Sequence, residues 1–195
     1  MENARIKNKK SLLRTHYSNV RCQLPRTQVV RATYVIARRF FDFVTTIHNS
    51  VFSIAGYYQI KNELNILQLL QQLNQRGYVC ALPRIVQGTR ILEFKQWHKG
   101  DQLEEKYIPE PLKTAKTLVP DIMIAPLLAC DKRGYRLGYG AGYYDKTINT
   151  LRQHKPHTLV IGLCFHKQLS SCTLPHEPHD QKLDIIITEK TIIRI

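Results

Sequence analysis

The segment from Asp131 to Asp145 gathers residue types that can hold phosphate groups. It reads D-K-R-G-Y-R-L-G-Y-G-A-G-Y-Y-D and contains four of the nine glycines of the chain. Alternating glycines permit positive φ angles and close approach, so that backbone N–H groups can turn toward one anion. A helix that begins directly after such a loop adds its N-terminal dipole. Arg136 supplies a planar cation, and the Asp145 carboxylate can hold a magnesium ion.

The spacing of this glycine string separates it from the common nucleotide motifs. The chain has no G-K-[ST] sequence, so the loop is not a P-loop, and G-x-G-x-G differs from the dinucleotide pattern G-x-G-x-x-G. On the glycines alone, two interpretations stay open. The loop is either a phosphate cradle or a Gly/Tyr-rich turn that packs on the sheet.

The elements that position this loop follow from hydrophobic periodicity. Helices are predicted twice within Asn3–Thr46, with a break at Pro25, then over Glu63–Gln75, and from the glycine loop to about His154. The first helix shows Leu12, Leu13, Tyr17 and Val20 at helical spacing, and 132–142 is predicted to be a loop. Short apolar runs predict strands at Val51–Tyr57, Tyr78–Leu82 (closed by Pro83), Ile91–Trp97, Asp121–Pro126, Thr158–Phe165, Asp184–Thr188 and Thr191–Ile195.

Alternating helices and apolar strands predict an α/β fold. We expect a single three-layer domain over residues 1–195, in which a mostly parallel sheet has helices on both faces. In open sheets of this kind, ligands bind at the carboxyl ends of the strands.

Composition bounds the function class. The chain has 195 residues, with 29 Lys and Arg against 15 Asp and Glu, and a net charge of +14. This surplus favours an anionic partner. Five cysteines without C-x-x-C spacing, three of them in apolar segments, indicate buried thiols in a reducing compartment. MENARIKNKK lacks a following apolar stretch, and no apolar run approaches the ~20 residues of a membrane span. We therefore expect a soluble, cytoplasmic protein.

The string R-L-G-Y-G-A-G-Y-Y-D resembles the signature of the 5-formyltetrahydrofolate cyclo-ligase family, also called 5,10-methenyltetrahydrofolate synthetases. Other family elements are matched in the same order along nearly the whole chain. They are K-S-L-L-R from Lys10 to Arg14, Glu63 followed by Arg76-Gly77 and C-A-L-P-R, Trp97, Tyr107-Ile-Pro-Glu110-Pro111, and P-H-E-P-H-D from Pro175 to Asp180 with Asp184 beyond it. The chain departs from the pattern at Ala141, where many members carry glycine or lysine, so a side-chain contact to phosphate is lost there.

The resemblance implies an ATP-dependent ligase that converts 5-formyltetrahydrofolate to 5,10-methenyltetrahydrofolate, with ADP and phosphate as the other products. It implies Mg²⁺ as the cofactor, held by Asp145 and Asp180, and catalytic roles for Arg136 and Tyr144. The substrate pocket is implied to involve Glu63, Tyr58, Trp97 and Tyr143. The ATP-binding residues are implied to be Lys10, Arg14, Arg136, Leu137, Gly138, Tyr139, Gly140, Ala141, Gly142, Tyr143 and Tyr144.

Each of these assignments has a plainer alternative. Lys10 and Arg14 lie on a helix face that also fits a solvated surface, and Glu63 could act only on a helix dipole. Trp97 fits a core position as well as a pocket wall. His176 and His179, near Glu177 and Asp180, suggest a zinc site, but prolines preclude the helical H-E-x-x-H geometry, and magnesium prefers the oxygen ligands.

Two other functions remain open on the sequence. A basic chain with ten tyrosines could be a nucleic-acid-binding module, although the basic residues are dispersed and no recognition motif is present. A related ATP-dependent ligase with another substrate would carry the same loop. We favour small-molecule partners, with no nucleic acid, no membrane and a monomeric chain.

Overall fold

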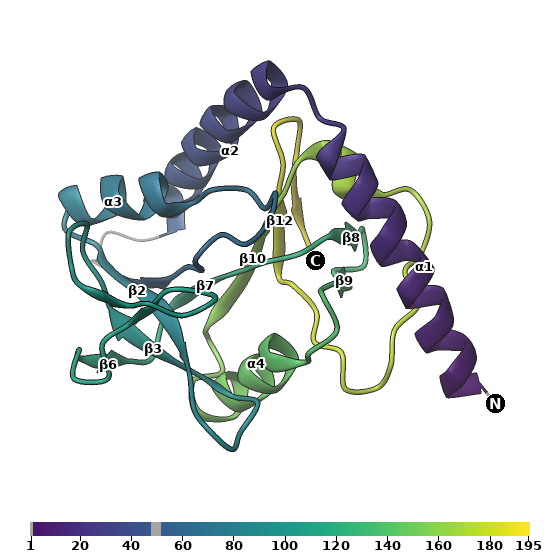
Figure 1. Cartoon of the computed structure of the whole chain (residues 1–195). Helices are drawn as coiled ribbons and strands as arrows, with labels where there is room; N and C mark the ends of the chain where they lie inside the picture. Colours follow the sequence, from purple (N-terminus) through teal and green to yellow (C-terminus); the bar gives the residue numbers. More distant parts are fainter. Residues whose placement is uncertain (1, 48–51) are drawn as a thin grey trace.

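The computed structural model describes residues 2–47 and 52–195, and its four α-helices lie on several sides of one large sheet (Figure 1). Helix α1 spans Glu2–Cys22 and α2 spans Arg26–Ile47, so the break falls at Pro25 as expected. Helix α3 covers Leu67–Gln75, and α4 covers Tyr143–His154 directly after the glycine loop. No helix among the described residues is long and apolar enough to cross a membrane.

The main sheet has eight strands, and its five central strands run parallel. Neighbouring strands follow the order β13-β12-β10-β7-β1-β2-β3-β6. Strands β12, β10, β7, β1 and β2 pair in parallel, whereas β13, β3 and β6 join the edges in antiparallel fashion. The bounds, in sheet order, are Ile192–Arg194, Ile185–Ile187, Leu159–Leu163, Ile122–Ala125, Ser53–Ala55, Val79–Ile85, Leu92–Gln96 and Thr117–Leu118.

Two small sheets extend the fold around the main one. One has three strands, β11 (Leu169–Ser170), β8 (Ala129–Asp131) and β9 (Arg136–Leu137), and the 3-10 helix η1 (His166–Gln168) precedes β11. The other pairs β4 (Leu103–Glu104) with β5 (Glu110–Pro111). Helix α1 lies beside β8 and β9, separate from the main sheet (Figure 1).

The core divides into two layers around the main sheet. Helices α2 and α3 pack on one face, through side chains such as Phe40 and Leu70, which have no exposed surface. Helix α4 covers the other face through Ile148, which is also fully buried. The expected α/β fold, a mostly parallel sheet with helices on both faces, is therefore confirmed. The thiols expected to be buried, those of Cys80, Cys130 and Cys164, are buried and unpaired by disulfides.

Several expected boundaries shift. Helix α3 begins at Leu67 rather than Glu63, and the residues before it form a loop. Strand β2 runs through Pro83, because β1 pairs only with residues 79–81. Pro83 therefore has a strand neighbour on one side only, where a missing N–H donor is tolerated. The first expected strand, Val51–Tyr57, is observed as Ser53–Ala55, and Val51 lies outside the described residues.

The contacting face of α1 is the largest departure from the sequence expectation. Leu12 of the expected apolar stripe is 73% exposed, but Tyr17 is buried and packs with Leu13 in an apolar cluster. Beside them, Lys10 and Arg21 are only 6% and 4% exposed. Lys10, Arg14, Tyr17 and Arg21 follow one another at spacings of four and three, so they share one helical face. This basic face packs against the loops that surround the glycine string, because those loops supply carboxylates and carbonyl oxygens.

Candidate active site

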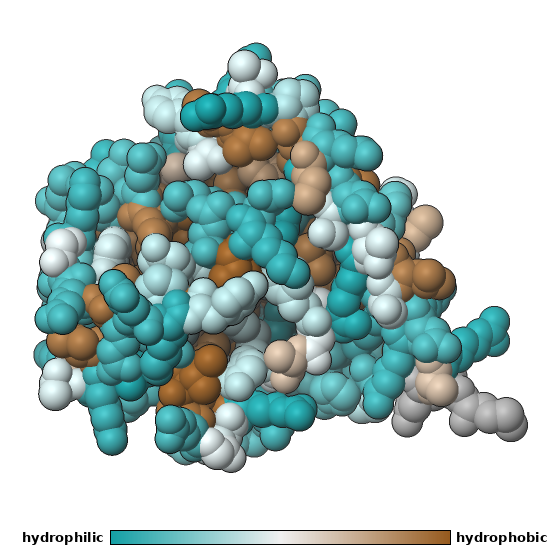
Figure 2. Space-filling view, viewed as in Figure 1, coloured by the Kyte–Doolittle hydropathy of each residue, from teal (hydrophilic) through white to brown (hydrophobic). Residues whose placement is uncertain are grey.

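A cavity of about 320 Å³ opens at the carboxyl ends of the central strands. Its walls come from α1, the loop after β1, the β2–β3 hairpin, the glycine loop with the start of α4, and the loop at residues 177–180. The face shown in Figure 2 is hollowed near its centre, where apolar and pale side chains stand among hydrophilic ones. The location agrees with the rule that ligands bind at this edge of an open α/β sheet.

The glycine loop forms one wall with unpaired backbone donors. Gly140 and Gly142 have φ angles of 102° and 77°, and Gly142 is the residue that precedes the first turn of α4. None of the backbone amides from Gly138 to Gly142 donates a hydrogen bond to another described residue. The first amides of α4 lack intrahelical partners as in any helix. Free donors and a helix N-terminus together make an anion-binding site.

Two cations of α1 reach this wall. The Nε atom of Arg14 donates to the carbonyl oxygen of Gly138 at 2.8 Å. The Nζ atom of Lys10 donates to Glu177 at 2.9 Å and to Asp180 at 2.5 Å. This ion pair holds the pKa of Glu177 below its usual value, because the charged carboxylate accepts from Lys10. Neither cation is a freely solvated surface group.

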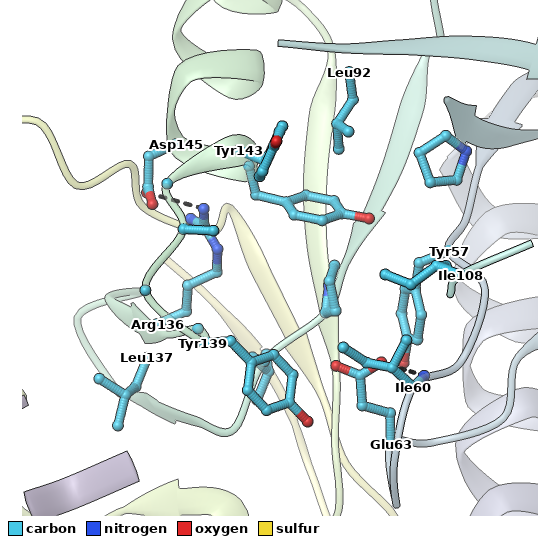
Figure 3. A pocket seen from close by; sticks show the side chains of 18 of the residues that line it. Tyr57, Ile60, Glu63, Leu92, Ile108, Arg136, Leu137, Tyr139, Tyr143 and Asp145 are labelled. Atoms are coloured by element: carbon cyan, nitrogen blue, oxygen red, sulfur yellow. Dashed lines mark hydrogen bonds and ion pairs between the residues drawn. The ribbon is translucent and has the colours of Figure 1, made fainter. Parts of the chain in front are cut away.

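Arg136 binds the glycine loop to two other segments. Its guanidinium donates to the Asp145 carboxylate at 2.9 Å and to the carbonyl oxygen of Gln181 at 2.6 Å, and the first contact is drawn in Figure 3. The backbone N–H of Gln181 donates to the same Asp145 oxygen at 2.9 Å. Burial lowers the pKa of Arg136, and the nearby Asp145 opposes that effect. The three residues form a closed network beneath the loop.

The carboxylates around this network could hold a hard cation. Glu177, His179 and Asp180 have ligand atoms within 4.8 Å of one another. Asp145 and Asp180 each accept hydrogen bonds through one carboxylate oxygen, which leaves the other oxygen for a ligand. Carboxylate oxygens are the ligands that magnesium prefers, so the group around Asp180 fits Mg²⁺, whereas Asp145 is not part of that group. His176 is not in this group and stacks on Tyr135 instead, with ring centroids 3.9 Å apart.

Glu63 lies on the opposite wall, in the loop between β1 and α3. Its Oε2 atom accepts from the backbone N–H of Ile60 at 3.0 Å, whereas its buried Oε1 atom has no partner. Burial raises the pKa of Glu63, and the Ile60 hydrogen bond and the charge of Arg21 oppose that rise. Because α3 begins four residues later, the Glu63 carboxylate closes a local turn and does not cap the helix. Its free oxygen is available for a donor in the cavity.

Tyrosine rings complete the cavity between these two walls. Tyr57, Tyr139 and Tyr143 surround the same open space as Glu63 (Figure 3). The Tyr57 hydroxyl donates to the carbonyl oxygen of Leu64 at 3.0 Å, and the Tyr139 hydroxyl accepts from Arg21 at 2.6 Å. Burial raises the pKa of Tyr57, Tyr139 and Tyr144 above the usual tyrosine value. These three rings are therefore neutral, flat walls at physiological pH.

All of the residues assigned from the sequence to catalysis, ATP, substrate or magnesium line this cavity, with one exception. Trp97 is not on the lining and is 6% exposed, packed in the core with α2 and α3. The structure therefore favours the core position, the alternative that the sequence left open for Trp97. Trp97 directly follows β3, and its backbone N–H donates to the carbonyl oxygen of Cys80. This hydrogen bond orients the residue so that its ring enters the core layer.

Sequence reasoning missed several lining residues. Tyr57 follows β1, Pro126 and Leu127 follow β7, and Pro83 and Ile85 belong to the last part of β2. All of them lie at or near the carboxyl ends of central strands, so the strand-end rule could have indicated them. Further lining residues that the sequence did not assign to a site come from other segments: Ile60, Leu92, Ile108 and Glu110. Glu177 and His179, which the sequence suggested only as part of a zinc site, also line the cavity.

Comparison with known proteins agrees with this geometry. The model of the 5-formyltetrahydrofolate cyclo-ligase family matches residues 6–189. The chain is 30% identical to the 5-formyltetrahydrofolate cyclo-ligase of Escherichia coli over 149 residues, which cover 72% of this chain and 79% of that protein. It is 26% identical to the Saccharomyces cerevisiae 5-formyltetrahydrofolate cyclo-ligase, with 91% and 94% of the two chains covered.

Two solved structures share the fold. The 5,10-methenyltetrahydrofolate synthetase of Aquifex aeolicus matches with a TM-score of 0.79 at 24% identity, over 95% of this chain and 92% of that one. The Mycoplasma pneumoniae 5,10-methenyltetrahydrofolate synthetase matches with a TM-score of 0.73 at 23% identity, over 92% and 98% of the two chains. With a family match that extends over nearly its whole length, the chain belongs to the 5-formyltetrahydrofolate cyclo-ligase family.

Proposed function

We propose that this chain uses ATP to close 5-formyltetrahydrofolate into 5,10-methenyltetrahydrofolate, with ADP and phosphate as the other products. Family membership gives the activity, a ligase of one-carbon metabolism. The residue assignments rest on two walls of the cavity that carry hydrogen-bonding groups without partners. Free amides from Gly138 to Gly142 face the same cavity as the unpartnered oxygen of Glu63. One wall suits an anion and the other suits an N–H donor.

The reaction needs this combination because a formamide oxygen is a poor leaving group. Transfer of the γ-phosphoryl group of ATP to that oxygen breaks the terminal P–O bond of ATP and releases ADP. N10 then attacks the formyl carbon, and the oxygen leaves as phosphate. Catalysis of phosphoryl transfer consists mainly of positioning and charge stabilisation, so cations and free amides are the groups to expect.

In this proposal, the glycine loop and α1 bind the triphosphate. The Gly138–Gly142 amides contact its oxygens, and Arg14 and Lys10 neutralise its charge. Arg136 is already hydrogen-bonded to Asp145 and Gln181, so its catalytic contribution is to hold the loop and to add positive charge beneath it. Ala141 contributes a backbone N–H only.

We assign Asp145 and Asp180 as the residues that would hold Mg²⁺. The ion would neutralise charge on the phosphate oxygens when bound. The residues of this chain prepare that site, because Arg136 fixes one oxygen of Asp145 and Lys10 fixes one oxygen of Asp180. Each carboxylate is therefore oriented before a ligand arrives.

The pterin ring is assigned to the opposite wall. Glu63 would accept hydrogen bonds from pterin N–H groups, since an ionised carboxylate offers only acceptors. Tyr143, Tyr144 and Tyr58 would supply flat contacts for the ring. We further propose one domain over residues 1–195 that acts as a monomer in the cytoplasm, where its buried free thiols would stay reduced.

The test is formation of the methenyl product, followed by its near-ultraviolet absorbance. We expect product only when ATP, magnesium and 5-formyltetrahydrofolate are all present. No product from the folate, together with phosphate release when another formyl or carboxyl compound is supplied, would indicate a related ligase with another substrate. No product, together with tight RNA binding by the folded protein, would overturn the proposal in favour of a nucleic-acid-binding module.

A further inference from the structure

Arg21 is a buried cation that the proposed reaction leaves without a role. It is 4% exposed, in the last turn of α1, and it is not on the lining of the cavity. Within the described part of the chain no carboxylate lies within 4 Å of its nitrogens, and its Nε atom has no hydrogen-bond partner. Burying a cation without a counterion destabilises the folded state, so a functional role would explain why Arg21 is buried here.

The partner of this unsatisfied cation is an unsatisfied anion. Only two side-chain atoms of the described residues are fully buried without a partner, Arg21 Nε and Glu63 Oε1. They carry opposite charges and belong to neighbouring segments, and the charge of Arg21 opposes the burial-driven rise in the pKa of Glu63. The end of α1 is also joined to the Glu63 loop, where the Asn62 side chain donates to Cys22 Sγ at 3.0 Å.

Arg21 is bonded to the glycine loop as well. One terminal nitrogen donates to the Tyr139 hydroxyl at 2.6 Å, and the other to the carbonyl oxygen of Leu127 at 3.4 Å. Its charge opposes the rise in the pKa of Tyr139 and of Tyr57, and the charge of Glu63 promotes that rise in both. Among the described residues, Arg21 is therefore the one cation whose charge acts on Glu63, Tyr57 and Tyr139 alike.

We propose that Arg21 is a positioning residue that keeps Glu63 ionised for pterin binding and fixes the Tyr139 ring beside it. Arg21 lies outside the cavity lining, so it acts through Glu63 and Tyr139 and does not contact the substrate. The inference rests on the proposed role of Glu63, and it adds the group that makes a buried carboxylate usable as an acceptor. A protonated Glu63 would present an O–H group and would lose the capacity to accept from two N–H donors.

Several groups face Glu63 and must be weighed together. The cations are Arg21 from α1 and Lys61 from the loop of Glu63 itself. Tyr57 after β1, Tyr139 of the glycine loop and Tyr144 of α4 are neutral hydroxyls near it. Lys61 lies 5.0 Å from the centroid of the Tyr139 ring and reaches solvent, so its charge is screened more than that of Arg21. Arg21 is thus the dominant buried cation.

The experiment measures the affinity of the full chain for 5-formyltetrahydrofolate by calorimetry between pH 6 and pH 8.5. An opposite charge nearby lowers a carboxyl pKa by about 1–3 units. Arg21→Met should therefore weaken folate binding more at pH 6 than at pH 8.5, by up to about tenfold for each unit by which the carboxyl pKa rises. Arg21→Lys loses the hydrogen-bond geometry but keeps the charge, so it should restore the wild-type pH dependence. Arg31→Met, at an exposed position of α2, is the matched control.

A uniform loss of affinity across the pH range in both Arg21 variants would overturn the proposal and leave Arg21 a structural role. Thermal melts identify a variant that does not fold, and Arg21→Gln then replaces Arg21→Met under the same criterion. Glu63→Gln separates the role of Glu63 from that of Arg21. If Glu63→Gln binds folate normally, the assigned role of Glu63 fails. If Glu63→Gln weakens binding but Arg21→Met shows no pH dependence, only the role of Arg21 fails.

In the Glu63→Gln background, the titrating group is absent. Adding Arg21→Met there should produce no further dependence on pH, although a constant loss from Tyr139 can remain. A pH-dependent effect in the double variant would assign the titration to another group and would refute the inference.

Discussion

A methyl group added to Gly140 tests whether the glycine loop is an ATP cradle or a packing turn. Gly140 has a φ of +102°, and a Cβ there would lie 3.1 Å from Cζ of Arg14 and 3.1 Å from one of its terminal nitrogens. Arg14 is not free to move without loss, because its Nε atom donates to the Gly138 carbonyl oxygen at 2.8 Å. Gly140→Ala should displace this side chain.

The chain offers a control with nearly the same backbone. Gly100 has a φ of +99°, and its Cβ would meet nothing within 4 Å. Both alanine variants should lose about 1–2 kcal/mol of unfolding free energy from the left-handed backbone alone. Only Gly140→Ala also disturbs a hydrogen bond from a charged group, worth about 1.5–3 kcal/mol. If that loss falls on the ATP complex, affinity drops by roughly 10- to 100-fold.

The assay is calorimetric titration of each variant with ATP and magnesium, and separately with 5-formyltetrahydrofolate, beside urea unfolding. We expect weaker ATP binding in Gly140→Ala, unchanged ATP binding in Gly100→Ala, and folate affinity close to wild type in both. If Gly140→Ala binds ATP as tightly as Gly100→Ala does, the cradle is refuted and the loop is a structural turn. Equal weakening of both ligands in Gly140→Ala would likewise indicate a structural turn.

Three further outcomes are expected from the charged network. Lys10→Met removes the shared partner of two mostly buried carboxylates, so it should lower the free energy of unfolding, measured in urea, by about 3 kcal/mol. The control Lys9→Met, at an exposed position, should change the free energy of unfolding by less than about 0.5 kcal/mol. Asp145→Asn should raise the magnesium concentration needed for half-maximal ATP use, and it should also lower the melting temperature because the buried Arg136 guanidinium loses its carboxylate partner; wild-type magnesium dependence would remove Asp145 from the site. The lowered pKa of Glu177 means that its stabilisation is present above pH 4.5 and is lost as pH falls through the folded-state value. Glu177→Gln should therefore flatten the acid side of a stability–pH curve, and an unchanged curve would contradict this.

Local sequence was sufficient for the parts of the site that depend on neighbouring residues. The glycine string predicted both the loop and the start of α4, since positive φ angles at Gly140 and Gly142 are a local requirement of the backbone. The apolar runs predicted the central strands, because strands covered on both faces are apolar throughout. Together these two patterns were enough for the α/β fold and for a phosphate-binding interpretation of one wall.

The other wall depended on contacts between distant residues. Leu64, Leu67, Leu70 and Leu73 have helical spacing, yet the turn closed by Glu63 and Ile60 delays the start of α3. That turn is what leaves one Glu63 oxygen free toward the cavity. Periodicity predicts burial at these positions equally well for a loop or a helix, so it could not separate the two.

The packing of α1 was decided only by the tertiary structure. Its leucines suggested an apolar contact face, but Lys10 is buried by Glu177 and Asp180, which lie 167 and 170 residues away along the chain. Arg21 is likewise bonded to Tyr139, 118 residues away. A basic helix face is ordinarily solvated, and it becomes a buried one only where carboxylates from elsewhere meet it. The desolvation of a charge depends on partners that have no fixed spacing in the sequence. Hydrophobic periodicity alone therefore could not have predicted which cations of α1 are buried.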